Sequence, residues 1–140
     1  MLDTNVVLDW LLFQHPDGLA VAAALAAGEL RWIATPAMQD EFAHVLERDA
    51  LARWQPDPPA LRARWAAHCT LVAAPVAPLD GPRCTDPDDQ KFIDLAAGQA
   101  GCLLLSRDRA VLKLARRLAP RGVTLTTPTA WAAARARPPC

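Results

Sequence analysis

Short apolar runs alternate along the chain with longer stretches in which an apolar residue recurs every three or four positions. The short runs at residues 30–35, 101–106 and 122–126 are typical of buried strands. A further strand is expected at residues 71–76, on a sheet edge because it contains proline. The longer stretches are typical of amphipathic helices. This alternation predicts one domain, residues 1–140, with an α/β fold: a three-layer α/β/α sandwich around a central, mainly parallel sheet.

Two acidic residues are expected at the carboxyl ends of strands. Asp3 follows the apolar start of the chain, and Asp108 follows the run at residues 101–106. Open α/β sheets place their functional sites at these strand ends. Asp108 could equally cap the helix that follows it, so its position alone does not decide its role.

Two further acids lie on predicted helices. Glu41 projects about 40° from the apolar Val45, at the margin of the apolar face, where a partly exposed surface residue is the simpler interpretation. Asp89 lies in the middle of an apolar face, and Asp88 points about 100° away from it. A carboxylate on a buried face is costly unless a cation meets it. Asp89 is therefore the better candidate ligand, and Asp86 and Asp88 are better suited to cap the helix.

Asp3, Glu41, Asp89 and Asp108 would repel one another if they converged, unless a cation neutralised them. A site of oxygen ligands alone suits a hard divalent ion, Mg²⁺ or Mn²⁺. Such an ion can activate water for attack on a phosphoryl group. The four acids therefore favour a metal-dependent phosphodiesterase.

Composition excludes several other classes of protein. No apolar run approaches the roughly 20 residues of a membrane span, and no basic segment precedes an apolar stretch as in a secretory signal. The four cysteines, Cys69, Cys84, Cys102 and Cys140, are scattered and form no C-x-x-C pair, which argues against a zinc ribbon. These features predict a reduced, cytoplasmic protein without a membrane partner.

The second half of the chain carries a candidate surface for RNA. Residues 1–70 have four more acidic than basic residues, and residues 71–140 have the reverse excess. One continuous helix is expected after Asp108, with Arg109, Lys113, Arg116 and Arg117 on a single face. These basic residues could contact a nucleic-acid backbone, or they could form an ordinary solvated face.

Several motifs, in this order, resemble the PIN-domain ribonucleases, in particular the toxin components of bacterial toxin–antitoxin pairs. The motifs are LDTNVV at residues 2–7, TPAMQDEF at 35–42, DPDDQKFIDLA at 86–96, LLLSRD at 103–108 and GVTLTTPTAW at 122–131. The resemblance implies a Mg²⁺- or Mn²⁺-dependent endoribonuclease with Asp3, Glu41, Asp89 and Asp108 as its acidic quartet. Asn5, Ser106 and Asp86 are the expected polar supports. An antitoxin partner and a homodimer are also implied, and the five tryptophans of the chain could contribute to such contacts or to the core.

The chain departs from the family pattern at three places. Only Met1 and Leu2 precede Asp3, so the first strand is expected to be short. Serine stands at position 106, where threonine is commoner, and Ala110 stands where a further acid often follows. The first departure most affects how Asp3 is placed.

Two alternative functions compete with the nuclease. A PIN-like module could act through protein or RNA contacts while cleaving nothing. A phosphotransfer domain of receiver type also clusters acids on an α/β fold, but it needs a lysine at a strand end. Lys91 and Lys113 are both expected within helices, which disfavours that class.

Overall fold

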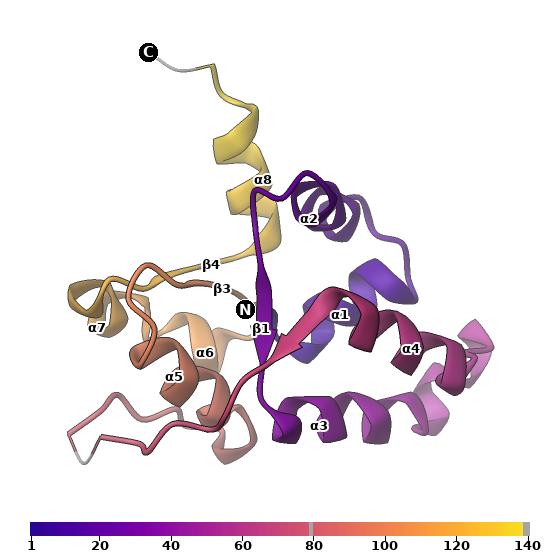
Figure 1. Ribbon diagram of the computed structural model, residues 1–140, viewed down its shortest axis with the longest axis horizontal. Helices are drawn as coiled ribbons and strands as arrows, with labels where there is room; N and C mark the ends of the chain where they lie inside the picture. The colour runs from indigo at the N-terminus through magenta and orange to yellow at the C-terminus, as the bar shows by residue number, and fades with distance from the viewer. Residues whose placement is uncertain (79, 139–140) are drawn as a thin grey trace.

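The computed structural model describes residues 1–78 and 80–138 and shows an α/β arrangement of helices and short parallel strands (Figure 1). The strands are β1 (Trp32–Ala34), β2 (Cys69–Leu71), β3 (Leu103–Leu105) and β4 (Thr124–Thr126). The α-helices are α1 (Thr4–Leu11), α2 (Pro16–Ala26), α3 (Pro36–Leu46), α4 (Pro58–His68), α5 (Gln90–Ala97), α6 (Arg109–Leu112), α7 (Ala115–Leu118) and α8 (Pro128–Ala136). Three short 3-10 helices are η1 (Asp49–Trp54), η2 (Pro87–Asp89) and η3 (Ala119–Arg121).

All described strand pairs are parallel. β1 pairs with β2 in the register Trp32↔Cys69, and β3 pairs with β4 in the register Leu103↔Thr124. The α/β fold with parallel strands is thus confirmed. In the described part of the chain, however, the strands form two separate two-stranded sheets and not one continuous central sheet.

The first residues of the chain extend the β3–β4 sheet by a single parallel bridge, Leu2↔Leu105. The backbone N–H of Asp3 donates to the Leu105 carbonyl at 3.0 Å, and the N–H of Leu105 donates to the Met1 carbonyl at 3.1 Å. The buried terminal amine of Met1 donates to the Leu103 carbonyl at 2.7 Å. The expected first strand is therefore present only as a bridge, and it still places Asp3 at the carboxyl end of β3.

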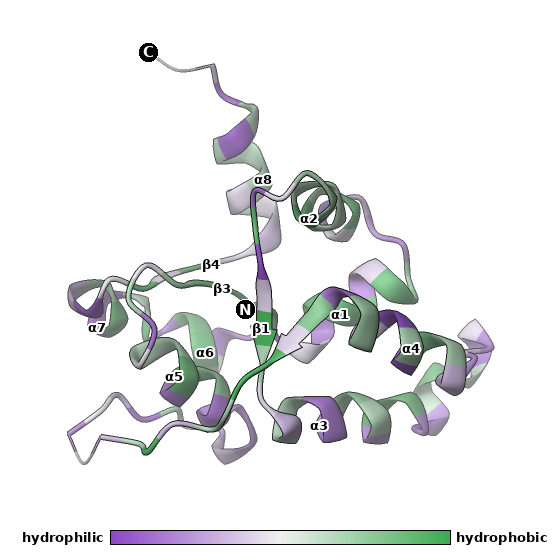
Figure 2. Cartoon of the chain, in the orientation of Figure 1, coloured by the Kyte–Doolittle hydropathy of each residue, from purple (hydrophilic) through white to green (hydrophobic). Residues whose placement is uncertain are grey.

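The helices enclose the strands from several directions. In Figure 1, α1, α3 and α4 lie on one side of β1, and α5, α6 and α7 lie on the other. Hydrophobic and hydrophilic residues alternate along these helices, as expected where one face packs on a core (Figure 2). Trp10, Trp32 and Trp65 are buried in that core, with Trp32 edge-on to the other two at 5.8 Å and 4.9 Å between ring centroids.

Two predicted elements are wrong in position or extent. The strand expected at 71–76 is β2, which directly follows α4 and ends before the prolines; Val76 is 96% exposed. The single helix expected after Asp108 is two four-residue helices, α6 and α7, which are interrupted at residues 113–114. In both cases the apolar pattern marked the region correctly but could not locate the hydrogen-bonded residues.

Other expectations concern the cysteines and the membrane. Cys69, Cys84 and Cys102 are free thiols, and Cys140 lies outside the described residues. Among the described residues, no helix has the length and apolar character needed to cross a membrane.

Candidate metal centre

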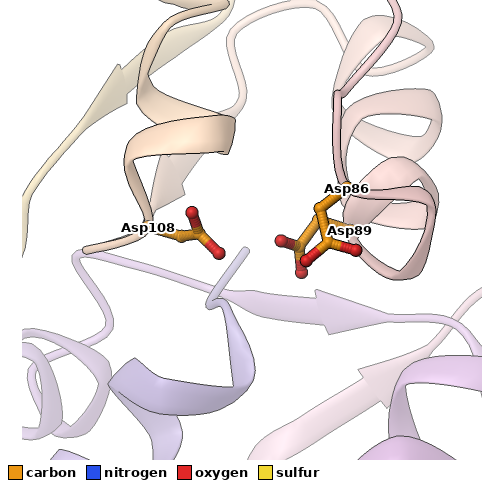
Figure 3. Close-up of side chains that lie close together, drawn as sticks. All are labelled: Asp86, Asp89 and Asp108. Carbon is orange, nitrogen blue, oxygen red and sulfur yellow. The ribbon is translucent and has the colours of Figure 1, made fainter.

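Three aspartates gather where η2 meets the loop before α6. Asp86, Asp89 and Asp108 each present a carboxylate oxygen, and these oxygens lie within 4.8 Å of one another. Figure 3 shows the carboxyl group of Asp108 facing those of Asp86 and Asp89 across a gap. Residues that are about 20 positions apart in the sequence thus supply a single acidic site.

Helix capping explains how two of these carboxylates are oriented. Asp86 precedes η2 and accepts a hydrogen bond from the Asp88 N–H at 3.0 Å. Asp108 precedes α6 and accepts from the Ala110 N–H at 2.8 Å. Each cap employs one oxygen, so a carboxylate can hold its helix start and still present an oxygen to the cluster.

Capping does not explain the third carboxylate. Asp89 is 8% exposed, whereas Asp88 is exposed, as the helical phase predicted. Within the described residues, the buried Oδ2 of Asp89 has no hydrogen-bond partner. Burial raises the pKa of Asp89 to about 7, and hydrogen bonding with Asp108 and the negative charges of Asp3, Asp108 and Asp86 act in the same direction.

Asp3 lies beside this cluster and is held by a serine. It is 4% exposed, and its Oδ2 accepts a hydrogen bond from the Ser106 hydroxyl at 2.6 Å. The same hydroxyl oxygen accepts from the Asp108 N–H at 3.0 Å, so Ser106 joins two of the predicted quartet. Burial raises the pKa of Asp3 against the opposing effect of the Ser106 hydrogen bond, and the charges of Glu41 and Asp108 raise it further.

Glu41 has different partners. One of its oxygens pairs with the Lys91 ammonium at 2.9 Å, and the other accepts a hydrogen bond from the Thr4 hydroxyl. The Lys91 ammonium also donates to the Asp88 carbonyl oxygen. Glu41 is therefore near enough to influence Asp3 but does not belong to the three-aspartate cluster.

Comparison with models of known protein families shows which family the chain is related to. The family model described as PIN domain matches residues 1–110, well over half of the chain. The chain belongs to the PIN-domain family. No curated protein and no solved structure matches it.

PIN domains are generally nucleases and typically use divalent metals, although members can be inactive. The donor set of this PIN domain fits such an ion, since all three clustered ligands are carboxylates and one buried oxygen of Asp89 lacks a protein partner. Three like charges this close would also be strongly unfavourable without a cation or bound protons.

Analysis of the sequence missed two residues of this PIN domain and placed others differently. Thr4 and Lys91 both bind Glu41. They lie 37 and 50 positions from it in the sequence, so no local pattern indicates either contact. Asn5, an expected support, is exposed, and in the described part of the chain its side chain has no hydrogen bond. Asp86, expected as a support, lies within the cluster, whereas Asp3 and Glu41 lie outside it.

Proposed function

We propose that the chain is a Mg²⁺- or Mn²⁺-dependent endoribonuclease, the toxin of a toxin–antitoxin pair. The observation that carries the proposal is the convergence of Asp86, Asp89 and Asp108, with an unpartnered buried oxygen among them. Membership of a family whose members are generally nucleases supports it independently. For the fold, we propose the three-layer α/β/α sandwich expected of this family.

The proposed ligands are the quartet Asp3, Glu41, Asp89 and Asp108, together with Asp86. A divalent ion there would polarise a phosphoryl oxygen and lower the pKa of a water molecule for in-line attack. The chain's own residues would supply the negative charge and the orientation. Ser106 fixes Asp3 relative to Asp108 through its two hydrogen bonds, so these two acids keep a common geometry.

The path of the RNA is proposed to follow the basic residues after Asp108. Arg109, Lys113, Arg116 and Arg117 are all exposed, on α6, on α7 and at the break between them. Exposed cations beside an acidic cluster suit an anionic backbone that must reach a metal. We place the activity in the cytoplasm, where RNA is abundant and cysteines stay reduced.

The proposal includes two protein partners. An antitoxin and a homodimer follow from the family branch that the motifs resemble. Trp54 is 43% exposed, and the Phe13 ring packs against it at a tilt, with 4.7 Å between the ring centroids, so this pair offers an apolar surface for a partner.

The experiment is cleavage of a fluorescently labelled RNA by the purified chain. We expect products with Mn²⁺ or Mg²⁺, none with EDTA, and loss of cleavage in Asp108→Asn. Asp94→Asn is the matched control. Asp94 lies on α5, accepts a hydrogen bond from the Gln90 side chain at 2.8 Å and does not belong to the cluster. Cleavage that survives both EDTA and Asp108→Asn would contradict the proposal.

A PIN-like binding module without activity is the second candidate. It is favoured by one observation, the engagement of both Glu41 oxygens by Lys91 and Thr4, which leaves the quartet incomplete. RNA binding without cleavage at saturating Mn²⁺ would support this candidate over the ribonuclease.

A further inference from the structure

Lys91 is the cation closest to the proposed ligands. Of the ion pairs among the described residues, only Lys91–Glu41 includes a member of the quartet. The pair joins α3 to α5, which lie on opposite sides of β1 (Figure 1). Both side chains are about three-quarters buried, with exposed fractions of 24% and 22%. The ammonium is therefore part of the site and not a solvated surface charge.

Each oxygen of Glu41 already accepts a hydrogen bond from another side chain. Lys91 takes Oε1 and Thr4 takes Oε2. A metal ion bound by Glu41 would compete with the Lys91 ammonium for the same negative charge, and two cations cannot both lie against one carboxylate oxygen without strong repulsion. Ligation by Glu41 would therefore weaken its pair with Lys91 and favour movement of the ammonium away from the carboxylate.

A displaced Lys91 would remain beside the site. Its backbone is fixed in the first turn of α5, and its ammonium keeps a neutral partner in the Asp88 carbonyl, two residues after Asp86. An ammonium that has lost its carboxylate is poorly satisfied by one carbonyl in a partly buried position. The anion that a phosphodiesterase brings to this position is the phosphate itself, which lysine binds well as a compact charge.

We propose that Lys91 is a phosphate-binding residue of the site, held on Glu41 until a divalent cation takes that carboxylate and then available to an RNA phosphate. The inference rests on the proposed function and adds to it a cation supplied by the chain. Metal binding and RNA binding would therefore favour each other. A bound metal ion would release the Lys91 ammonium for an RNA phosphate, and a phosphate that binds Lys91 would leave the Glu41 carboxylate available to the metal.

The first test measures Mn²⁺ binding alone, by calorimetry, without RNA. Lys91→Met removes the competing charge and should bind Mn²⁺ about three- to tenfold more tightly. Lys91→Arg keeps the charge and should stay within about twofold of the unmodified chain. In a Glu41→Gln background, Lys91→Met should give little gain, because the shared carboxylate is gone. Arg62→Met, an exposed position on α4 without an ion pair among the described residues, controls for the loss of a positive charge.

The second test measures RNA binding with saturating Ca²⁺ at several salt concentrations. Lys91→Met should bind RNA more weakly, and the slope of log K against log salt should be flatter by roughly 0.7, the value for one lost phosphate contact. Lys91→Arg should restore most of that slope. A purely structural role in holding Glu41 would instead weaken Mn²⁺ binding and leave the slope unchanged.

Either of two results overturns the proposal: Mn²⁺ affinity that is equal or lower in Lys91→Met, or an unchanged salt slope for RNA. A chain that passes both titrations but cleaves no RNA refutes the ribonuclease and leaves the lysine exchange standing. A chain that cleaves RNA while Lys91→Met behaves like the unmodified protein in both titrations refutes the exchange alone.

Discussion

Asp89→Asn should stabilise the chain at neutral and alkaline pH when no metal is present. Asp89 is buried among other acids, and burial raises its pKa to about 7, far above the value near 4 of an unfolded chain. Between these pH values the folded protein binds a proton that the unfolded chain lacks. The stability that this group contributes is therefore fully present below about pH 4 and is lost as the pH rises through about 7.

The size of the effect can be bounded from that difference. A separation of about three pKa units corresponds to at most about 4 kcal/mol. Because Asp86 and Asp108 are only half-buried and water can screen their charges, we expect about 1–2 kcal/mol. For a domain of this length, that is a rise of roughly 3–8 °C in Tm.

The assay is thermal or urea unfolding in EDTA from pH 5 to pH 8. The unmodified chain should lose stability across this range. Asp89→Asn should lose less and be more stable at pH 8, and the part that remains comes from Asp3, whose pKa burial also raises. Asp88→Asn is the control, because that side chain is exposed and should leave the pH dependence intact. A pH-independent stability of the unmodified chain, or a less stable Asp89→Asn at pH 8, would contradict a raised pKa of Asp89 in the folded protein.

Three further expectations follow from the same structure. Mn²⁺ or Mg²⁺ should raise the Tm of the unmodified chain, since a ligand that binds only the folded state stabilises it; a Tm that is insensitive to both ions would count against the site. Replacing Lys113 and Arg116 together with Ala should flatten the salt dependence of RNA binding by roughly 0.7 per lost contact without changing cleavage-site choice, and identical slopes would make these residues a solvated face. Gly18→Ala should destabilise the fold by about 1–3 kcal/mol in urea unfolding, because the new Cβ would lie 2.7 Å from the Trp10 backbone nitrogen. Gly98→Ala is the control and should have a small effect, since the nearest contact of its Cβ is at 3.7 Å. Equal effects of the two substitutions would contradict the packing of α2 on α1.

The sequence predicted the parts of the structure that depend on burial. Helical phase separated the buried Asp89 from the exposed Asp88, and the apolar run before Ser106 marked β3. Periodicity reports which face of an element packs inward, and the face of Asp89 is fixed by neighbours within two turns. The same logic placed Asp3 at the carboxyl end of a first strand, which the structure reduces to one bridge to β3.

The sequence could not predict what depends on distances between elements. Glu41 lies at the margin of an apolar face whether it binds a metal, water or Lys91, so its ion pair was not foreseeable. Asp86 was expected to cap a helix, and it does, but one capping oxygen does not exclude a second role. The strand predicted at residues 71–76 was misplaced for a related reason. Pairing with β1 determines which residues form β2, and these are Cys69–Leu71.

Calorimetric titration of Mn²⁺ into the chain and into variants of two neighbouring aspartates tests whether Asp89 binds the metal ion. Asp89 presents its buried carboxylate to Asp86 and Asp108, whereas Asp88 is exposed. We predict saturable binding at pH 8, at least about tenfold weaker in Asp89→Asn and unchanged in Asp88→Asn. The affinity should fall as the pH drops below about 7, because Asp89 must lose its proton to bind the ion. Equal Mn²⁺ affinity in Asp89→Asn and the unmodified chain, or an Asp88→Asn variant that is just as impaired, would contradict this prediction.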